Sequence, residues 1–335
     1  MVVLIVTNEK SGLDKYSQEI AKRLNVKRVE SRRYLSLIEA YRLSRLVRRQ
    51  GDVVHLPNQH FARYALFLKN PFVVTVHDLV RLCFGFAKET ITEKILLKLD
   101  IRGIKRASHI IATSQNTGND LIKYLKIPNG RISVVYNGVD HSIFKPYDTK
   151  VLDKPYILYV GSERPRKNLG RLCEAFAKLK GEFPELKLVK VGPSGRYKRF
   201  RTKTMRMLDS LGITQDVIFV DYASDLDLAR YYSSAALLAY PSLYEGFGLP
   251  PLEAMACGCP VVTSNTSSLP EVVGEAGIMV NPYDTESQFQ AIRQVLTDNT
   301  LRDEMIRKGL EQSKRFSWEE TASQTQEVYE KVGGA

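Results

Sequence analysis

Long hydrophobic runs are absent from this sequence, which limits the classes of protein that it can encode. In 335 residues the purely apolar stretches, such as residues 2–6, reach only the length of a β-strand. A membrane-spanning helix needs about 20 apolar residues. Because a strand begins at the second residue, we also expect no signal peptide. The sequence therefore predicts a cytoplasmic protein without a membrane-spanning segment.

Cysteine is scarce as well. The chain has four: Cys83, Cys173, Cys257 and Cys259. The spacing of the last two matches neither a zinc site nor a redox motif, so we interpret all four as thiols of a protein from a reducing compartment. Asp225 and Asp227 resemble a metal-binding pair, but they open a predicted helix, where acidic residues are expected anyway. We predict no metal site and no cofactor.

Three common motifs of nucleotide-binding and hydrolytic enzymes are also missing. No Gly-x-Gly-x-x-Gly follows the first predicted strand, which disfavours a dinucleotide-dependent oxidoreductase. No Gly-x-x-x-x-Gly-Lys-Ser/Thr occurs, which disfavours a P-loop enzyme. The Gly-x-Ser-x-Gly turn that carries a nucleophilic serine does not occur either.

Acidic residues are in deficit, and only in the first half of the chain. The net charge is +12; residues 1–150 hold 26 Lys and Arg against 13 Asp and Glu, whereas residues 151–335 hold 23 against 24. A basic half can bind nucleic acid, an anionic membrane surface or an anionic substrate.

The densest basic stretch is residues 22–49, where ten Lys and Arg face only two acidic residues. At helical spacing Ile38 and Tyr41 lie on an apolar face of this stretch, but Arg45 and Arg48 interrupt it. Two interpretations stay open here: a helix that lies on an anionic membrane, peripheral at its inner face, and a solvated charged surface.

Apolar strand patterns alternate with helix patterns, which is typical of parallel sheets covered on both faces. The first set has strands at 2–6, 53–56, 72–76, 109–112 and 132–135, and helices at 14–24, 91–105 and 116–126. A polar, proline-bounded linker follows at 144–155. The second set has strands at 156–160, 186–191, 217–220, 235–239, 260–263 and 277–280, and helices at 168–180, 197–211, 226–233, 250–257, 285–297, 300–316 and 318–332.

The length of the chain suits two domains of this kind. The predicted fold class is α/β, with two Rossmann-like, doubly wound domains at residues 1–145 and 146–317. We expect them to face one another across a cleft that holds the ligand.

The stretch from Tyr240 to Val262 carries the clearest chemistry. A strand leads into a glycine loop, and a helix opened by Pro250 and Pro251 follows. Backbone amides at a helix N-terminus suit an anion, and the carboxylates of Glu245 and Glu253 can each accept from a pair of sugar hydroxyls. This stretch therefore predicts a site for a nucleotide sugar.

Two further strand ends carry candidate residues. Lys167 precedes Asn168, a predicted helix N-cap, and a cation there is unfavourable unless an anion binds beside it, so we interpret Lys167 as a diphosphate ligand. Arg164 and Arg166 are either further ligands or surface residues. His77, which ends another strand with Asp78 beside it, either donates to a sugar hydroxyl or satisfies a turn carbonyl. Gly12 is either a loop glycine or one that allows close approach of a ligand.

These features together resemble the retaining glycosyltransferases of GT-B fold known as family 4. The most specific stretch is Glu245-Gly-Phe-Gly-Leu-Pro-Pro-Leu-Glu253, whose two glutamates have that family's spacing. Supporting stretches are residues 135–140 with Phe144, residues 161–169, Pro270-Glu271 before Gly277, and Phe316-Ser-Trp318. The resemblance covers nearly the whole chain and implies that the last helix, about 318–335, packs back on the acceptor-side N-terminal domain.

The resemblance also implies a role for each matching residue. Glu245 would hold the donor sugar, together with the loop Gly246, Phe247, Gly248 and Leu249, which would also hold the distal phosphate. Glu253 would accept from the ribose hydroxyls. Lys167, helped by Arg164 or Arg166, would neutralise the diphosphate leaving group without a metal. His77 would lie near the sugar, Asp78 on the acceptor side, and Gly12 against the donor.

The implied reaction retains the anomeric configuration, by same-face attack with the leaving phosphate as the base. GDP-mannose is the first expectation for the donor, with UDP-glucose or UDP-N-acetylglucosamine next, and the acceptor is a sugar or a lipid-linked sugar. Three positions depart from the family pattern: Ser162 stands where an arginine is common, Asp221 where a glycine is common, and Gly12 where a glycine pair is common.

Two other functions stay open. A basic nucleic-acid-binding protein would use the cationic half of the chain, but residues 22–49 lack interleaved aromatic residues, and Glu245 and Glu253 would have no role. An epimerase of the same fold would act on a nucleotide sugar, but it needs its own acid and base, and the sequence shows no clear set. We expect no nucleic acid as a partner.

Overall fold

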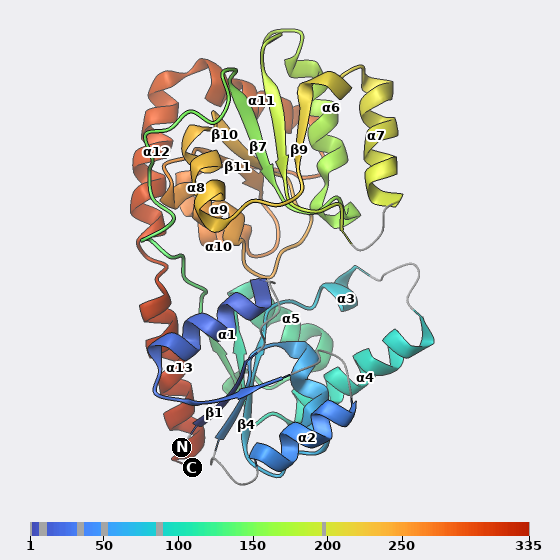
Figure 1. The fold of residues 1–335 in the computed structure, drawn as a ribbon, viewed down its shortest axis with the longest axis vertical. Helices are drawn as coiled ribbons and strands as arrows, with labels where there is room; N and C mark the ends of the chain where they lie inside the picture. Colours follow the sequence, from blue (N-terminus) through green and yellow to red (C-terminus); the bar gives the residue numbers. More distant parts are fainter. Residues whose placement is uncertain are drawn as a thin grey trace. The chain divides into compact units, whose positions relative to one another are not determined.

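The computed structural model describes residues 2–6, 12–31, 37–47, 53–84, 90–195 and 199–334. The chain divides into two compact units, unit 1 of Met1–Gly138 with Ser317–Ala335 and unit 2 of Val139–Phe316. In each unit a sheet is flanked by helices (Figure 1). No helix among the described residues is long and apolar enough to cross a bilayer.

Unit 1 is built on a parallel sheet whose described strands pair in the order β2-β1-β3-β4-β5-β6. The strands are β1 Val2–Val6, β2 Lys27–Glu30, β3 Val53–Leu56, β4 Phe72–Val76, β5 His109–Ala112 and β6 Ile132–Val134. The helices are α1 Gly12–Arg23, α2 Leu37–Val47, α3 Val80–Cys83, α4 Ile91–Arg106, α5 Gln115–Leu125 and α13 Trp318–Gly333, with 3-10 turns η1 Gln59–Leu66 and η2 Asn129–Arg131.

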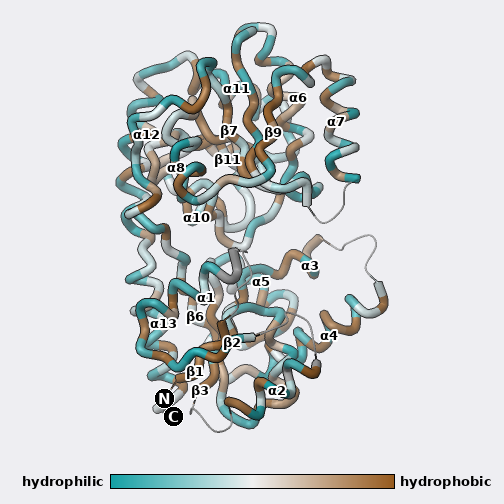
Figure 2. Tube along the Cα trace, in the orientation of Figure 1, coloured by the Kyte–Doolittle hydropathy of each residue, from teal (hydrophilic) through white to brown (hydrophobic). Residues whose placement is uncertain are grey.

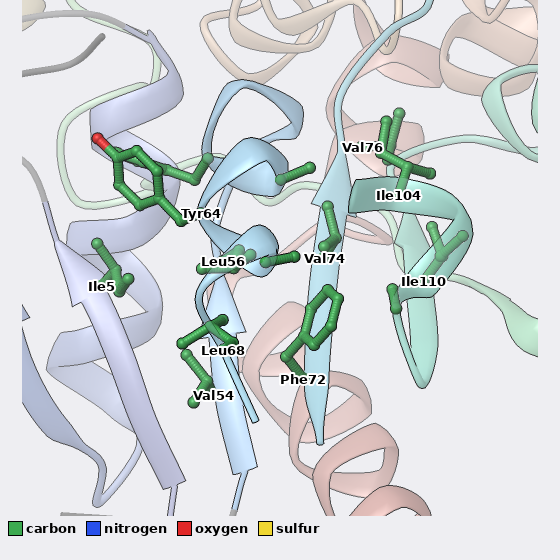
Figure 3. Close-up of a cluster of buried hydrophobic side chains, with 14 of the residues drawn as sticks. Ile5, Val54, Leu56, Tyr64, Leu68, Phe72, Val74, Val76, Ile104 and Ile110 are labelled. Atoms are coloured by element: carbon green, nitrogen blue, oxygen red, sulfur yellow. The ribbon is translucent and has the colours of Figure 1, made fainter. Parts of the chain in front are cut away.

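Strand β1 shows why this sheet is buried on both faces. Val3 and Ile5 belong to a core cluster shared with α2, η1, α4 and α5 (Figure 3). Leu4 and Val6 point the other way, into a cluster with α1 and α13. Because alternate residues enter opposite cores, the strand reads as one continuous apolar run.

Helix α13 belongs to unit 1 although the whole of unit 2 precedes it in the sequence. Trp318, at its start, is buried against α1, with its ring 6.3 Å from that of Tyr16. A Cβ on Gly138 would lie 2.2 Å from the backbone nitrogen of Trp318. The two segments therefore pass so closely that position 138 requires glycine.

Unit 2 is built on a second parallel sheet, whose described strands pair in the order β12-β11-β10-β7-β8-β9. The strands are β7 Tyr156–Val160, β8 Lys187–Val191, β9 Val217–Val220, β10 Leu237–Tyr240, β11 Val261–Ser264 and β12 Ile278–Val280. The helices are α6 Leu169–Leu179, α7 Arg199–Leu211, α8 Asp225–Ser234, α9 Leu249–Ala256, α10 Leu269–Val273, α11 Thr285–Thr297 and α12 Asn299–Ser313, with 3-10 turns η3 Pro165–Lys167, η4 Thr214–Asp216 and η5 Gly274–Ala276.

The sequence-based boundary at 145/146 differs from the division in the structure, where Val139 already belongs to unit 2. Phe144 is fully buried, and its ring lies 6.3 Å from that of Tyr232. The first part of the predicted linker is therefore attached to unit 2 by an aromatic anchor.

The predicted α/β class is confirmed, and the elements that the sequence missed have a physical reason. Strand β2 is the edge strand beside β1, and only Val29 in it is buried, so it lacks the apolar run of a central strand. Turn η1 buries Gln59 and Arg63 among apolar residues, so its composition resembles a polar loop. Helix α10 is too short to show a helical period.

Candidate functional site

Loops at the carboxyl ends of three adjacent strands form the candidate site in unit 2. Strands β11, β10 and β7 are neighbours in the parallel sheet, so the loops that follow them leave the same edge, where ligands bind in open α/β sheets. Two hydrogen bonds to one carbonyl join the loops after β10 and β7: the amide of Leu243 donates to the carbonyl oxygen of Arg166 (2.7 Å), and the side-chain hydroxyl of Ser242 donates to the same oxygen (3.2 Å).

Glu245 and Lys167, predicted separately, form one ion pair. The Lys167 Nζ lies 2.6 Å from Oε1 of Glu245 and 2.6 Å from the hydroxyl of Tyr240. Tyr240 and Ser242 also donate to Oε1, at 3.0 and 2.6 Å. On the other carboxylate oxygen, the Arg166 Nη1 lies at 3.2 Å. Of the two candidate arginines, Arg166 is therefore the one that contacts Glu245.

This cluster keeps Glu245 ionised although its side chain is buried. Burial alone would raise the pKa of the carboxyl, but Lys167 and Arg166 outweigh it and lower the pKa to about 2. The pKa of Tyr240 is raised well above 10 by burial and by the Glu245 charge, so the phenol stays protonated and can donate. The site thus holds a fixed negative charge between two fixed cations.

Two serines from the loop after β11 brace the glycine loop. The Ser267 hydroxyl accepts from the amide of Glu245 at 3.0 Å, and Ser267 has φ of 55°. The Ser268 hydroxyl donates to the carbonyls of Glu245 and Phe247, at 3.0 and 2.5 Å. Sequence reasoning missed both residues; the hydroxyl run just before Pro270-Glu271 was the signal that could have found them.

The predicted loop residues lie where helix α9 begins. Gly246 and Phe247 precede the helix, Gly248 is its N-cap with φ of 125°, and Leu249 is its first residue. A Cβ on Gly248 would lie 3.0 Å from a methyl of Leu269, so both backbone angle and space favour glycine there. Phe247 is buried and packs edge-on against Phe316, with ring centres 5.8 Å apart.

Asn168 has another role than the cap bond predicted for it. It occupies the N-cap position of α6, but its side chain makes no capping hydrogen bond. Instead its amide donates to the carbonyls of Pro241 and Pro282, at 2.9 and 2.7 Å. Asn168 therefore ties the Lys167 turn to the loops after β10 and β12.

Glu253, the second motif glutamate, lies in α9. Its side chain is buried, and it accepts from the hydroxyl of Tyr232 in α8 at 3.1 Å. Burial and the Glu253 charge raise the pKa of Tyr232 well above 10, so this phenol also stays a donor.

Arg164 is exposed and lies beside Gly195: its Cγ would be 3.4 Å from a Cβ at that glycine. The neighbouring Glu163 forms a buried charge cluster that the sequence did not reveal. Its Oε1 lies 3.1 Å from the Lys190 Nζ on β8 and 2.6 Å from Nε of Arg201 on α7. These long-range partners fix the loops after β7 and β8 to one another.

The candidate residues of unit 1 are His77 and Asp78, which directly follow β4, and Gly12, which lies at the start of α1. The Nε2 of His77 bonds the carbonyl of Pro57 at 2.9 Å, which is the turn-carbonyl alternative rather than donation to a sugar. Burial lowers the pKa of His77 to about 4, so the ring is neutral near pH 7 and Nδ1 is its acceptor nitrogen. Asp78 accepts from the amide of Val80 at 3.2 Å. Gly12 begins α1; residues 7–11 before it lie outside the described residues.

The remaining sequence predictions concern thiols and metals. All four cysteines lie in described segments and are free; burial raises the pKa of Cys173 and of Cys257 to about 12.

Asp225 and Asp227, the pair that resembled a metal site, lie in the first turn of α8. Ser224 caps this helix and donates to the Asp227 carboxylate at 2.6 Å. Among the residues described, no cluster of three His, Cys, Asp or Glu is placed to hold a metal.

Comparison with known families bears directly on this site. The model of the glycosyl transferases group 1 matches residues 142–312, more than half of the chain and nearly all of unit 2. The chain belongs to the glycosyl transferases group 1 family. A second model, Glycosyltransferase Family 4, matches residues 2–143, so the resemblance found in the sequence is confirmed over both units of this glycosyl transferase group 1 protein.

Two relatives come from Escherichia coli. The O-antigen chain mannosyltransferase B is 41% identical over 179 residues, which are 52% of this chain and 45% of that protein. The serotype-specific mannosyltransferase WbdA is 35% identical over 233 residues, 65% of this chain and 28% of that protein. The chain thus spans less than half the length of these curated relatives.

A solved structure shows the fold of the group. The structure of Anabaena HepE in complex with UDP-glucose superposes with a TM-score of 0.84 at 18% identity, over 99% of both chains. The predicted GT-B architecture of two Rossmann-like domains is confirmed at the level of the fold.

Proposed function

We propose that this chain transfers a glycosyl group from a nucleotide-diphosphate sugar to a sugar or lipid-linked acceptor. The observation that carries the proposal is Glu245, a buried carboxylate held ionised by Lys167 and Arg166 on a loop of backbone amides. A paired, hydrogen-bonded charge at the carboxyl edge of a parallel sheet suits a ligand with many hydroxyls and a diphosphate.

GDP-mannose is the first proposal for the donor, because the relatives with the highest identity quoted above are named mannosyltransferases. A UDP-sugar is the next, because HepE was solved with UDP-glucose. No residue of the site described above distinguishes guanine from uracil.

In this proposal Glu245 and Lys167, the two members of the ion pair, have different roles. Glu245 accepts from the donor sugar hydroxyls while Arg166 keeps it ionised, and Lys167 neutralises the diphosphate as it departs. A cation already fixed by Tyr240 and Glu245 stabilises the developing charge without reorganisation. We propose metal-independent transfer with retention, by attack on the face of the departing phosphate, whose oxygen takes the acceptor proton.

The other candidates complete the proposed site. Glu253, oriented by Tyr232, accepts from the ribose hydroxyls, and the amides of residues 246–249 bind sugar and phosphate. Arg164 is the outer cation for the nucleotide, and Gly12 admits the donor. His77 accepts a hydrogen bond from a sugar hydroxyl at Nδ1, since its Nε2 donates to the carbonyl of Pro57. Asp78 lies on the acceptor side, and a lipid-linked acceptor would be met at an anionic membrane surface.

Thermal denaturation with a panel of nucleotides and nucleotide sugars, with and without EDTA, tests the proposal. A ligand at 100 times its Kd adds about 2.7 kcal/mol of stability, which raises Tm by several degrees. We expect one diphosphate family to do so in EDTA, followed by glycosyl transfer from that donor. A shift that EDTA abolishes would contradict metal independence.

Two other outcomes would favour the competing functions. A salt-sensitive shift with DNA or RNA, and none with a nucleotide, would favour nucleic-acid binding. Conversion of the bound sugar to its epimer without an acceptor would favour an epimerase. Lys167→Ala should weaken the donor-induced shift and slow transfer, because the cation proposed for the diphosphate is lost. Lys178→Ala is its matched control: Lys178 is exposed and pairs with Glu286 at 2.7 Å, so its loss should leave the donor-induced shift unchanged.

A further inference from the structure

Two helices of unit 1 expose large apolar side chains to solvent. On α4, Ile91 and Ile95 are 78% and 53% exposed. On α2, Ile38 is 83% and Tyr41 52% exposed. Isolated surface apolar residues are ordinary, but four on two helices of a basic unit are a feature to explain.

The two isoleucines of α4 belong to a single stripe. The stripe follows helical spacing and every member is exposed: Ile91, Ile95, Lys98, Arg102 and Lys105. Steps of four and three residues keep these side chains on one face. The first two turns of the face are therefore apolar, and the later turns are cationic.

The two acidic residues of α4 do not pair with the basic residues of the stripe, because both form other contacts. Glu93 completes the capping box with Thr90. Asp100 is buried and accepts both bonds of a forked pair with Arg63, at 2.7 and 2.6 Å. The solvent face of the helix therefore stays cationic.

Helix α2 carries a shorter stripe of the same kind, with Ile38, Tyr41 and Arg45 exposed at steps of three and four. Both helices pack against η1, and the ring of Tyr41 lies 6.0 Å from that of Phe67, which caps this turn. Figure 2 shows hydrophobic and hydrophilic segments along α4.

We propose that these stripes on α4 and α2 dock unit 1 on an anionic lipid bilayer. The isoleucines and Tyr41 enter the boundary between headgroups and acyl chains, and the basic residues contact anionic headgroups. A nucleic acid would use the cations but not the exposed isoleucines, so the combination favours lipid. The surface deepens the proposed function and rests on it only for the lipid-linked acceptor; docking itself requires no donor.

The chain offers matched controls. Helix α7 of unit 2 also exposes basic residues, among them Arg199, Lys203 and Arg206, but none of the exposed large hydrophobic side chains recorded for the described residues lies on it. Ile122 and Tyr124 on α5 are apolar controls, 38% and 41% exposed.

Flotation of the full-length chain with vesicles tests the proposal, with phosphatidylglycerol in phosphatidylcholine against phosphatidylcholine alone. We expect binding only to the anionic vesicles. Lys98→Gln/Arg102→Gln/Lys105→Gln should lower the partition coefficient on the order of 100-fold, at roughly fivefold per basic residue. Ile91→Ser/Ile95→Ser should lower it on the order of tenfold.

The controls decide whether α4 is responsible. Arg199→Gln/Lys203→Gln/Arg206→Gln and Ile122→Ser/Tyr124→Ser should change the coefficient by less than roughly fivefold, the effect of a single basic residue at the membrane surface. Equal losses in the α7 variant, or unchanged flotation in both α4 variants, would overturn the proposal. It would also fall if RNA competed with the vesicles and the isoleucine variant bound both normally.

The donor-induced rise in Tm separates this proposal from the proposed function. All variants should keep it, because none alters the Glu245 site. If no protein shows a nucleotide shift but α4-dependent flotation holds, the docking surface stands and the glycosyl-transfer proposal fails.

Discussion

Glu245 and Lys167 form an ion pair that is largely buried from solvent. Their side chains are only 10% and 12% exposed. Removal of Glu245 leaves the charges of Lys167 and Arg166 without their buried counterion, whereas removal of Lys167 as well leaves one cation fewer to compensate. The pair therefore has a measurable stability signature besides any role in transfer.

A double-mutant cycle reads this signature. We expect Glu245→Gln to lower the free energy of unfolding on the order of 3 kcal/mol, and Lys167→Met/Glu245→Gln to lower it less. Urea denaturation gives both values. Both variants should lose transfer activity. A double variant less stable than Glu245→Gln would show that Lys167 and Glu245 do not form a coupled pair.

Ser267 combines an unfavourable backbone angle with a hydrogen bond to the amide of Glu245. Ser267→Gly and Ser267→Ala both remove the hydroxyl, but only glycine relieves the left-handed angle. We expect the glycine variant to be more stable than the alanine variant by about 1 kcal/mol, and both to bind the donor more weakly to the same extent. If the two variants instead differ in donor affinity as they differ in stability, Ser267 has only a structural role.

At the scale of elements, α13 is fastened to unit 1 by a buried polar chain. The Tyr329 hydroxyl lies 2.6 Å from Nδ1 of His55, whose Nε2 lies 2.8 Å from the hydroxyl of Thr75. Tyr16 of α1 joins the same hydroxyl at 3.0 Å. The helix that returns from unit 2 is thus tied to β3, β4 and α1 at once.

Tyr329→Phe tests this attachment. The variant leaves a buried ring nitrogen of His55 without its partner, so we expect a loss of about 1–3 kcal/mol. Hydrogen exchange should accelerate in α13 more than in α12. Tyr283→Phe, at a 59% exposed tyrosine of unit 2, should change neither. Equal acceleration across the chain would contradict a local attachment.

Sequence patterns located the buried elements well. Helix α11 and strands β1 and β4 lie where the periodicity put them, because their burial depends on residues a few positions apart. The edge strand β2 and turn η1 were missed, because their place is set by partners distant in the sequence.

At the scale of the whole molecule, unit 1 concentrates the perturbed histidines. Burial lowers the pKa of His55 to about 3, and the pKa of His77 and His109 to about 4. The unfolded chain binds these protons below about pH 6.5, and the folded unit does not until pH 3–4. Each histidine therefore costs stability as the pH falls through that window, on the order of 3 kcal/mol.

Unit 2 loses stability at a lower pH than unit 1. The pKa of Glu245 is lowered to about 2 in the folded unit, against 4.5 for an unperturbed glutamate, so its stabilisation is present above pH 4.5 and is lost towards pH 2. We expect unit 1 to unfold first on acidification. Fluorescence of Trp318, the single tryptophan and part of unit 1, should change at higher pH than hydrogen exchange in unit 2.

A histidine variant checks the cause of that order. His109→Gln should move the tryptophan transition to lower pH, whereas His141→Gln, at an exposed position, should leave it in place. One transition shared by both units, insensitive to His109, would refute the assignment.

Apolar periodicity and contiguous motifs were enough to predict the two α/β units, the glycine loop and the family, because these patterns depend only on neighbouring residues. Three contacts became visible only in the folded chain: Lys167 pairs with Glu245, Ser267 and Ser268 brace the glycine loop, and the Nε2 of His77 bonds the carbonyl of Pro57. Each of these contacts joins residues about 20 or more positions apart. Such distances follow from strand order in a sheet, which no local pattern encodes.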